Sequence, residues 1–317
     1  MYFPVSGITV NPLIPLVVTF VVSFFTSMGG VSGAFLLLPF QVSFLGFTSP
    51  AVSPTNLVYN IVSIPSGVYS YIKEQRMAWP LSVVTIAGTL PGVFIGALIR
   101  INYLHNQKNF KFFVGLVLLY IGVRLFYDLI PKKTAKKTKT DILEENFQEM
   151  ARQMREKTQT GETNLPAIKT IDFSLTKYTY SFYGETFSFN TIGLFSLTII
   201  VGIIGGIYGI GGGALIVPFL IAIFRLPVYT IAGAALLGTF VTSIAGILFY
   251  SLIAPYYAHT GLAIAPDWML GGLLGAGGFL GIYCGARVQK YMPAKTIKLI
   301  LIMIILFLAS RYISHFF

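Results

Sequence analysis

Residues 29–40 read GGVSGAFLLLPF, and residues 208–219 read YGIGGGALIVPF. The two stretches share glycines, a leucine and a Pro-Phe pair when they are aligned with a shift of 179 positions. One such match can arise by chance, whereas an internal duplication repeats several blocks in the same order. The matched pairs in this first block are Gly30/Gly209, Gly33/Gly212, Leu36/Leu215, Pro39/Pro218 and Phe40/Phe219.

Further blocks follow in the same order in both halves of the chain. The shift of 179 also pairs Gly67 with Gly246. A shift of 189 then pairs Trp79 with Trp268, the two tryptophans of the chain, and aligns two Gly-x3-Gly-x3-Gly runs, which are typical of closely packed membrane helices. These blocks indicate that the chain is a duplication. The aligned glycines are Gly88, Gly92 and Gly96 in the first copy and Gly277, Gly281 and Gly285 in the second.

Each copy contains five apolar segments, of which the second is short. A helix needs about 20 residues to cross the hydrocarbon core of a bilayer, and the short segments follow Gly-rich turns. We therefore expect a re-entrant helix hairpin and three crossings in each copy, which makes the two copies inverted repeats. The segments run over residues 11–28, 34–47, 50–72, 79–99 and 111–130, and over residues 190–207, 213–225, 229–253, 268–289 and 296–315.

The composition requires a bilayer as the solvent for most of the chain. Of the 317 residues, 55% are hydrophobic and only 10% are charged, and the mean hydropathy is +0.76. Soluble domains carry about 25% charged residues. The sequence therefore predicts an all-α membrane protein, with residues 1–130 as the first repeat, residues 190–317 as the second, and residues 131–189 as a small α+β insertion between them.

The distribution of charge predicts the orientation in the membrane. Residues 131–189 hold ten Lys/Arg and eight Asp/Glu, so the remaining chain holds twelve basic and three acidic residues. In the inverted arrangement, loops 73–78, 225–228 and 286–298 lie on the same side as the insertion and carry Lys and Arg. On the opposite side, loop 254–267 has none, and loop 100–110 is the exception, with Arg100 and Lys108. The positive-inside rule then places the insertion in the cytoplasm and both termini outside.

The insertion itself contains three kinds of pattern. Residues 132–139 are a basic run that serves as a topology signal and suits contact with anionic lipid headgroups. Residues 141–157 carry one apolar helical stripe. Residues 171–189 alternate aromatic and polar side chains, which predicts a small β-hairpin.

The Gly-rich turns before the short helices are the first part of a candidate site. Glycine allows a sharp turn and a close approach to a ligand, and a helix N-terminus offers unpaired N–H groups and a partial positive charge. If both turns lie deep in the membrane, they form an anion site without a cationic side chain. The candidate residues are Gly30, Ser32 and Gly33 in the first turn and Gly211, Gly212 and Gly213 in the second.

The long segment after each hairpin supplies matching polar positions at helical spacing. Bonding between neighbouring helices is an equally good explanation for any one of them, but a polar residue in both copies at Asn60 and Thr239 favours contact with a substrate. The candidate residues are Asn56, Tyr59, Asn60 and Ser63 in the first copy and Thr239, Thr242 and Ser243 in the second.

Several other chemistries are not supported. No Asp or Glu falls at a predicted midplane position, so a carboxylate relay is not expected. The single cysteine, Cys284, and the three scattered histidines form no metal-ligand pattern. The glycines at 205–213 lack the soluble βαβ context of a dinucleotide site. We therefore expect no enzyme activity, no cofactor and no nucleic-acid partner, and leave a homo-oligomer open.

The two motifs, each within a duplicated membrane unit, resemble the TauE/SafE sulfite exporter family over roughly residues 10–130 and 190–317, and the motif at 208–220, YGIGGGALIVPFL, is the more specific copy. The resemblance implies transport of sulfite, a sulfonate or a related organic anion across the cytoplasmic membrane. An anion channel, or an uptake carrier for another small oxyanion or carboxylate, remains an alternative. Residue patterns alone reach an inverted-repeat transporter of an anion.

Overall fold

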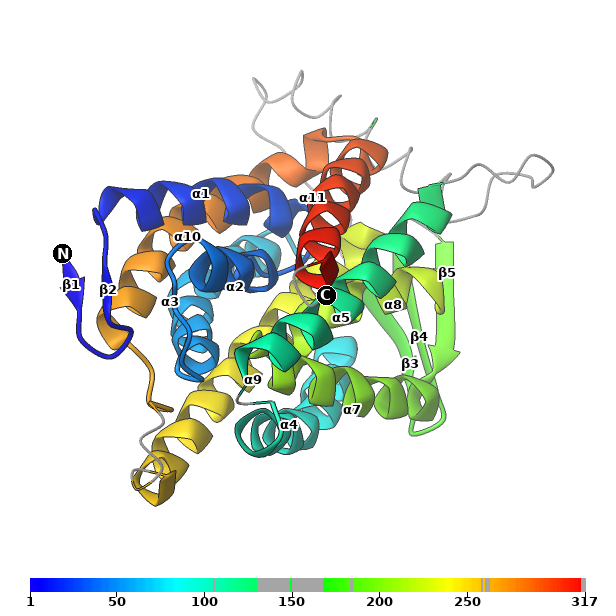
Figure 1. The fold of residues 1–317 in the computed structure, drawn as a ribbon. Coiled ribbons are helices and arrows are strands. Elements are labelled where there is room, and N and C mark those ends of the chain that lie inside the picture. The colour runs from blue at the N-terminus through cyan, green and yellow to red at the C-terminus, as the bar shows by residue number, and fades with distance from the viewer. Residues whose placement is uncertain are drawn as a thin grey trace.

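A computed structural model describes residues 1–104, 106–129, 149, 168–182, 185–257, 259 and 263–314. The protein is mostly helical, with two small antiparallel sheets (Figure 1). The helices of the first copy are α1 (Leu13–Met28), α2 (Ala34–Ser43), α3 (Val52–Lys73), α4 (Trp79–Asn102) and α5 (Gln107–Leu129). Those of the second copy are α7 (Thr191–Tyr208), η2 (Gly212–Leu215), α8 (Ile216–Ala222), α9 (Val228–Tyr257), α10 (Trp268–Val288), η4 (Gln289–Tyr291) and α11 (Ala294–Ser314).

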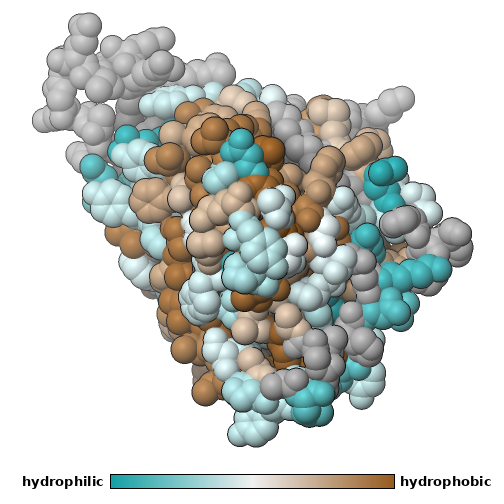
Figure 2. Space-filling model, turned by 60° about the vertical axis from the view of Figure 1, so that its left-hand side comes forward, coloured by the Kyte–Doolittle hydropathy of each residue, from teal (hydrophilic) through white to brown (hydrophobic). Residues whose placement is uncertain are grey.

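Five helices among the described residues are long and apolar enough to cross a membrane. They are α4, residues 108–127 of α5, α7, α9 and α10. Helix α3 has 22 residues but a more polar composition, because its sequence carries the Asn and Ser positions noted above. On the face shown in Figure 2, hydrophobic side chains run down one flank, and hydrophilic ones gather toward the opposite edge and the lower end.

The short second segment differs between the copies. In the first copy it forms one helix, α2, which begins directly after Gly33. In the second copy a 3₁₀ turn, η2, precedes the seven-residue helix α8. The predicted segments 34–47 and 213–225 therefore end too late, and the second does not begin as an α-helix. Three consecutive glycines favour this tighter start, because glycine does not specify α-helical dihedrals.

The two Gly-x3-Gly-x3-Gly runs are the seams along which helices pack most closely. Gly88, Gly92 and Gly96 place α4 against α7, and the aligned glycines place α10 against α1 (Figure 1). A Cβ atom at Gly92 would lie 2.5 Å from the carbonyl oxygen of Ile199, and one at Gly281 would lie 2.3 Å from that of Phe20. The backbones therefore touch directly, and no side chain fits between them.

Equivalent residues of the two copies make reciprocal contacts. A Cβ atom at Gly67 in α3 would meet Leu236 and Ile282, and one at Gly246 in α9 would meet Leu57 and Val93. The two groups of residues are equivalent in the sequence: Gly67 and Leu57 align with Gly246 and Leu236 at the shift of 179, and Val93 aligns with Ile282 at the shift of 189. Because the Leu57 region of α3 faces the Gly246 region of α9, and Gly67 faces Leu236, these two equivalent helices run antiparallel.

The sheets lie at opposite sides of the molecule (Figure 1). Strands β1 (Tyr2–Phe3) and β2 (Ile8–Thr9) form an N-terminal hairpin that the sequence did not predict. Strands β3 (Lys169–Phe173), β4 (Lys177–Phe182) and β5 (Glu185–Asn190) form a three-stranded antiparallel sheet, one strand more than the predicted hairpin. The basic run at 132–139 lies outside the described residues, as does the apolar stripe at 141–157 apart from residue 149.

Candidate functional site

Each Gly-rich segment turns through glycines with left-handed backbone conformation. Gly30 has φ +70° in the first copy, and Gly209 and Gly211 have φ +74° and +82° in the second. Residues other than glycine rarely adopt these backbone angles. We call residues 29–33 the first elbow and residues 209–213 the second elbow.

The two elbows turn at different depths along the helix pair α3 and α9. Gly30 packs against Ala232, near the start of α9, and Gly209 packs against Ser53, near the start of α3. These two helices are antiparallel, so the turning glycines lie toward opposite ends of the molecule. Beyond each turn the chain folds back toward the middle of α3, where the elbows come together.

Asn60, in the middle of α3, joins the two elbows. Its Oδ1 atom accepts a hydrogen bond from the hydroxyl of Ser32 in the first elbow. Its Nδ2 atom donates to the carbonyl oxygen of Ile210 in the second elbow at 2.9 Å, and to Oγ of Ser243 in α9 at 3.0 Å. One buried amide group thus bonds to three segments, the farthest of which lies 183 positions from Asn60 in the sequence.

Asn56 lies one turn before Asn60 and repeats this linking role. Its Nδ2 atom donates to the carbonyl oxygen of Ala34 at 2.9 Å and to that of Gly209 at 3.4 Å. Its Oδ1 atom accepts from Nε2 of Gln41 at 3.1 Å. Gln41 is a site neighbour that sequence reasoning missed, although it is the one amide side chain within the apolar short segment 34–43.

Tyr59 closes the first elbow against α1. Its hydroxyl forms a hydrogen bond of 2.6 Å with Oγ of Ser23. A Cβ atom at Gly33 would lie 2.5 Å from the same hydroxyl, so only glycine fits there. In the second copy the hydroxyl of Tyr208 donates to the carbonyl oxygen of Phe35 at 2.6 Å, which ties the end of α7 to α2. Ser23 and Tyr208 were not among the predicted residues.

The predicted residues of α9 face the second elbow, but the hydroxyl groups of Thr239 and Thr242 do not link both elbows as the side-chain amide of Asn60 does. Oγ1 of Thr242 accepts from the amide of Gly212 at 3.1 Å. Oγ1 of Thr239 donates to the carbonyl oxygen of Ala235, in its own helix, at 2.8 Å. A Cβ atom at Gly213 would lie 2.5 Å from the amide nitrogen of Thr239, so this position is a close backbone contact.

Several buried donors at this centre have no partner in the described part of the chain. The amide groups of Ser32 and Gly211 donate no hydrogen bond to described residues, whereas the amide of Gly33 faces the hydroxyl of Tyr59. The hydroxyl of Ser63, on the same α3 face as Asn60, is also without one. Buried donors without partners cost free energy, and they suit a ligand that brings only acceptors.

The predicted site residues therefore gather around one buried centre, with Gly30 on the outer side of the first turn. The polar side chains of this set are fully buried. In the described residues no group of three or more His, Cys, Asp or Glu could hold a metal ion. The centre thus offers neutral hydrogen-bond donors.

Comparisons with known proteins agree with this architecture. The family model described as sulfite exporter TauE/SafE matches residues 15–312. The chain is 24% identical over 295 residues to the probable membrane transporter protein YunE of Bacillus subtilis (strain 168). The alignment covers 90% of this chain and 92% of that protein. No solved structure matches. The resemblance found in the sequence is confirmed: the chain belongs to the sulfite exporter TauE/SafE family of membrane transporters.

Proposed function

We propose that this transporter carries a small sulfur-containing anion, sulfite or a sulfonate, across the cytoplasmic membrane through the centre where the two elbows meet. The observation that carries the proposal is the position of Asn60, which binds both elbows at once. The family description supplies the class of substrate. A channel, or an uptake carrier for another small oxyanion or carboxylate, is the alternative.

The chemistry of the centre supports an anion over a cation. Most of the unpartnered groups among the described residues of the centre are donors, the amide N–H groups of Ser32 and Gly211 and the hydroxyl of Ser63, beside one unpartnered acceptor, Oε1 of Gln41. Hydrogen bonds between such donors and a charged acceptor are stronger than those between neutral groups. A buried cation would need carboxylates or several free carbonyl oxygens, and the carbonyl oxygens of Ala34, Gly209 and Ile210 already accept from the two asparagines.

The membrane arrangement that we infer is a pair of inverted repeats, residues 1–130 and 190–317. The antiparallel packing of the equivalent helices α3 and α9 supports it. The short helix α2, at 10 residues, is too brief to cross the hydrocarbon core, which supports a hairpin that re-enters on one side. With the positive-inside rule, the insertion at 131–189 is cytoplasmic and both termini are outside.

A carrier suits this centre better than an open channel. The polar residues around Asn60 are fully buried and bonded across the two elbows. An anion can replace the acceptors in these bonds only if the elbows separate, so passage requires a conformational change. Transport of labelled sulfite into proteoliposomes with sulfite on the opposite side separates the two mechanisms, because a carrier is accelerated by substrate on the far side and a channel is not.

Two substitutions at Asn60 test the centre. Asn60→Asp keeps the shape of the side chain but replaces the donating NH₂ group with a negatively charged oxygen, so we expect at least tenfold weaker sulfite binding and transport. Asn60→Leu removes donor and acceptor and should also weaken binding. The control is Asn11→Asp at an exposed position, where Oδ1 accepts from the amide of Leu13 and the new carboxylate can keep that bond. Wild-type sulfite binding in Asn60→Asp would refute the proposed centre.

A further inference from the structure

The two ends of the helix pair α3 and α9 carry residues that are equivalent in the two copies but differ in their hydrogen bonds and charge pairing. The shift of 179 pairs Tyr71 of α3 with Tyr250 of α9, and the shift of 189 pairs Arg100 of α4 with Gln289 of η4. We call the Tyr71 side the Gln289 end and the Tyr250 side the Arg100 end. All four of these side chains are buried.

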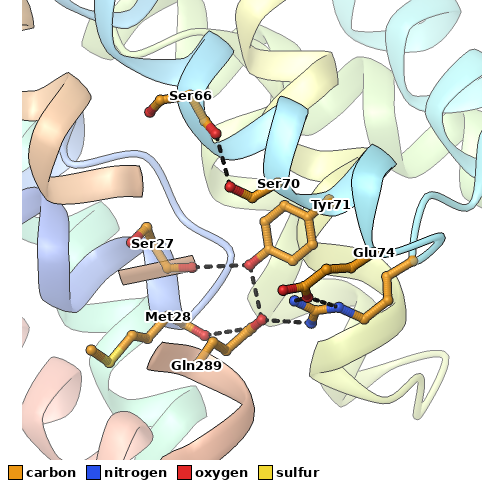
Figure 3. Close-up of polar contacts among 8 residues, drawn as sticks. Ser27, Met28, Ser66, Ser70, Tyr71, Glu74 and Gln289 are labelled. Atoms are coloured by element: carbon orange, nitrogen blue, oxygen red, sulfur yellow. Dashed lines mark hydrogen bonds and ion pairs between the residues drawn. The ribbon is translucent and has the colours of Figure 1, made fainter. Parts of the chain in front are cut away.

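The Gln289 end is fully hydrogen bonded (Figure 3). The hydroxyl of Tyr71 donates to Oε1 of Gln289 at 2.9 Å, and Nη1 of Arg76 donates to the same atom at 3.0 Å. Nε2 of Gln289 donates to the carbonyl oxygen of Met28 at 2.7 Å. The guanidinium of Arg76 also forms an ion pair with Glu74. The buried positive charge at this end is therefore neutralised by a carboxylate.

The Arg100 end holds a buried cation without a carboxylate. Arg100 is only 1% exposed, its guanidinium carbon lies 3.7 Å from the ring centroid of Phe110, and Nη1 donates to the carbonyl oxygen of Leu104. Its Nε atom has no hydrogen-bond partner among the described residues. No Asp or Glu of the described chain lies within ion-pair distance of this guanidinium. Burying an unpaired charge is expensive, which indicates a role beyond packing.

Two more unpartnered donors lie beside this cation. The hydroxyl of Tyr250 interacts electrostatically with Arg100 and with the hydroxyl of Ser53, and neither hydroxyl has a hydrogen bond of normal geometry to a described residue. Both residues are almost fully buried. Ser53 in turn touches the second elbow, because a Cβ atom at Gly209 would lie 2.6 Å from Oγ of Ser53. The three groups thus form a row from Arg100 to Gly209.

We propose that Arg100, Tyr250 and Ser53 form a second anion-binding site at the Arg100 end, which takes a small oxyanion before or after it occupies the centre. One guanidinium N–H and two hydroxyl groups supply three donors and a positive charge, and each suits an oxyanion oxygen. The next α3 residue on this face is Asn56, whose side chain donates to Gly209, so the row leads into the central site. The role in transport rests on the proposed function, whereas the binding does not.

The hydroxyl groups give the cleanest test, because neither has a hydrogen bond of normal geometry to the described residues. Purified Tyr250→Phe and Ser53→Ala are heated with increasing sodium sulfite and, separately, sodium chloride at equal ionic strength. We expect unfolding temperatures without sulfite to equal or exceed that of the wild type, because each variant removes a buried group without a partner. The apparent affinity for sulfite should fall about tenfold in each. Alanine fits at position 53, since Ala232 occupies the equivalent place in the second copy.

Tyr71→Phe is the matched control, because it removes the equivalent hydroxyl where that group is bonded. It should lower the unfolding temperature and leave the affinity for sulfite unchanged. Unchanged sulfite affinity in both Tyr250→Phe and Ser53→Ala would overturn the second site, even if Asn60→Asp loses sulfite binding. The reverse result, loss in these two variants and none in Asn60→Asp, would overturn the central site alone. A wild-type protein that sulfite does not stabilise would overturn both.

Discussion

The glycine seams and the polar ends of the two copies have diverged to different degrees. The seam between α4 and α7 and the seam between α1 and α10 retain the same glycines at the same spacing, and both bring backbones into contact. At the ends, Gln289 stands where the first copy has Arg100, and only the Gln289 end is satisfied by hydrogen bonds. Close packing thus constrained both copies alike, whereas the polar chemistry was free to differ.

The largest expected effect is on the seams, where the copies are most alike. We expect Gly92→Val and Gly281→Val each to abolish folding. The new Cβ atoms would lie within 2.5 Å of carbonyl oxygens of the neighbouring helix. The helices could relieve this clash only by moving apart, which would break the close backbone contact along the seam. Size-exclusion chromatography in detergent measures the folded fraction. Gly272→Ala is the control, because no atom lies within 4 Å of its added Cβ. A folded peak for one seam variant alone would show that the seams are not equivalent.

The next largest effect is at the Gln289 end. Gln289→Leu leaves Arg76 and Tyr71 without their shared acceptor and the carbonyl oxygen of Met28 without its donor. We expect a loss of about 3–5 kcal/mol in the free energy of unfolding, the usual cost of breaking a buried charged network. Denaturant titration in detergent measures it. A loss below about 1 kcal/mol would mean that the network contributes little to the fold.

Arg100→Gln makes the Arg100 end resemble the Gln289 end. The new amide can accept from Tyr250 as Gln289 accepts from Tyr71, so we expect the free energy of unfolding to change by no more than about 1 kcal/mol. The positive charge is lost, so the affinity for sulfite should fall at least tenfold. Thermal unfolding with and without sulfite measures both quantities. Severe destabilisation with normal sulfite affinity would assign Arg100 a purely structural role.

The smallest effect is expected at Thr239, the repeat partner of Asn60. Its hydroxyl donates to Ala235 within the same helix, so Thr239→Val removes no bond between segments. We expect the free energy of unfolding to change by about 0.5 kcal/mol or less, and sulfite counterflow to fall far less than in Asn60→Asp. An equal fall in both variants would show that the substrate contacts the two copies symmetrically.

Much of the fold followed from local patterns in the sequence. The long helices lie within a few residues of the predicted segments, because apolar runs of this length and the turns between them are set by neighbouring residues. The polar face of α3 was also predicted, since Asn56, Asn60 and Ser63 recur at helical spacing. The N-terminal hairpin was missed because its strands have only two residues each.

The polar contacts between distant segments could not be read in the same way. Gln41, Ser23 and Tyr208 carry no signal that assigns a partner, and their bonds depend on how helices cross. Ser53, Tyr250 and Arg100 likewise became a group only once α3, α4 and α9 were packed together. A periodic pattern shows which face of a helix is polar, but it does not show what that face meets.

Composition and local spacing were enough to predict a membrane protein with two similar halves, the positions of its long helices, and the glycines at which each half turns, because all of these depend on neighbouring residues. The tertiary structure decided that Ser32, Ile210 and Ser243 converge on Asn60, and that one buried arginine is neutralised whereas the other is not. The convergence on Asn60 depends on hydrogen bonds to residues 150 and 183 positions away, and such bonds are fixed only when helices pack.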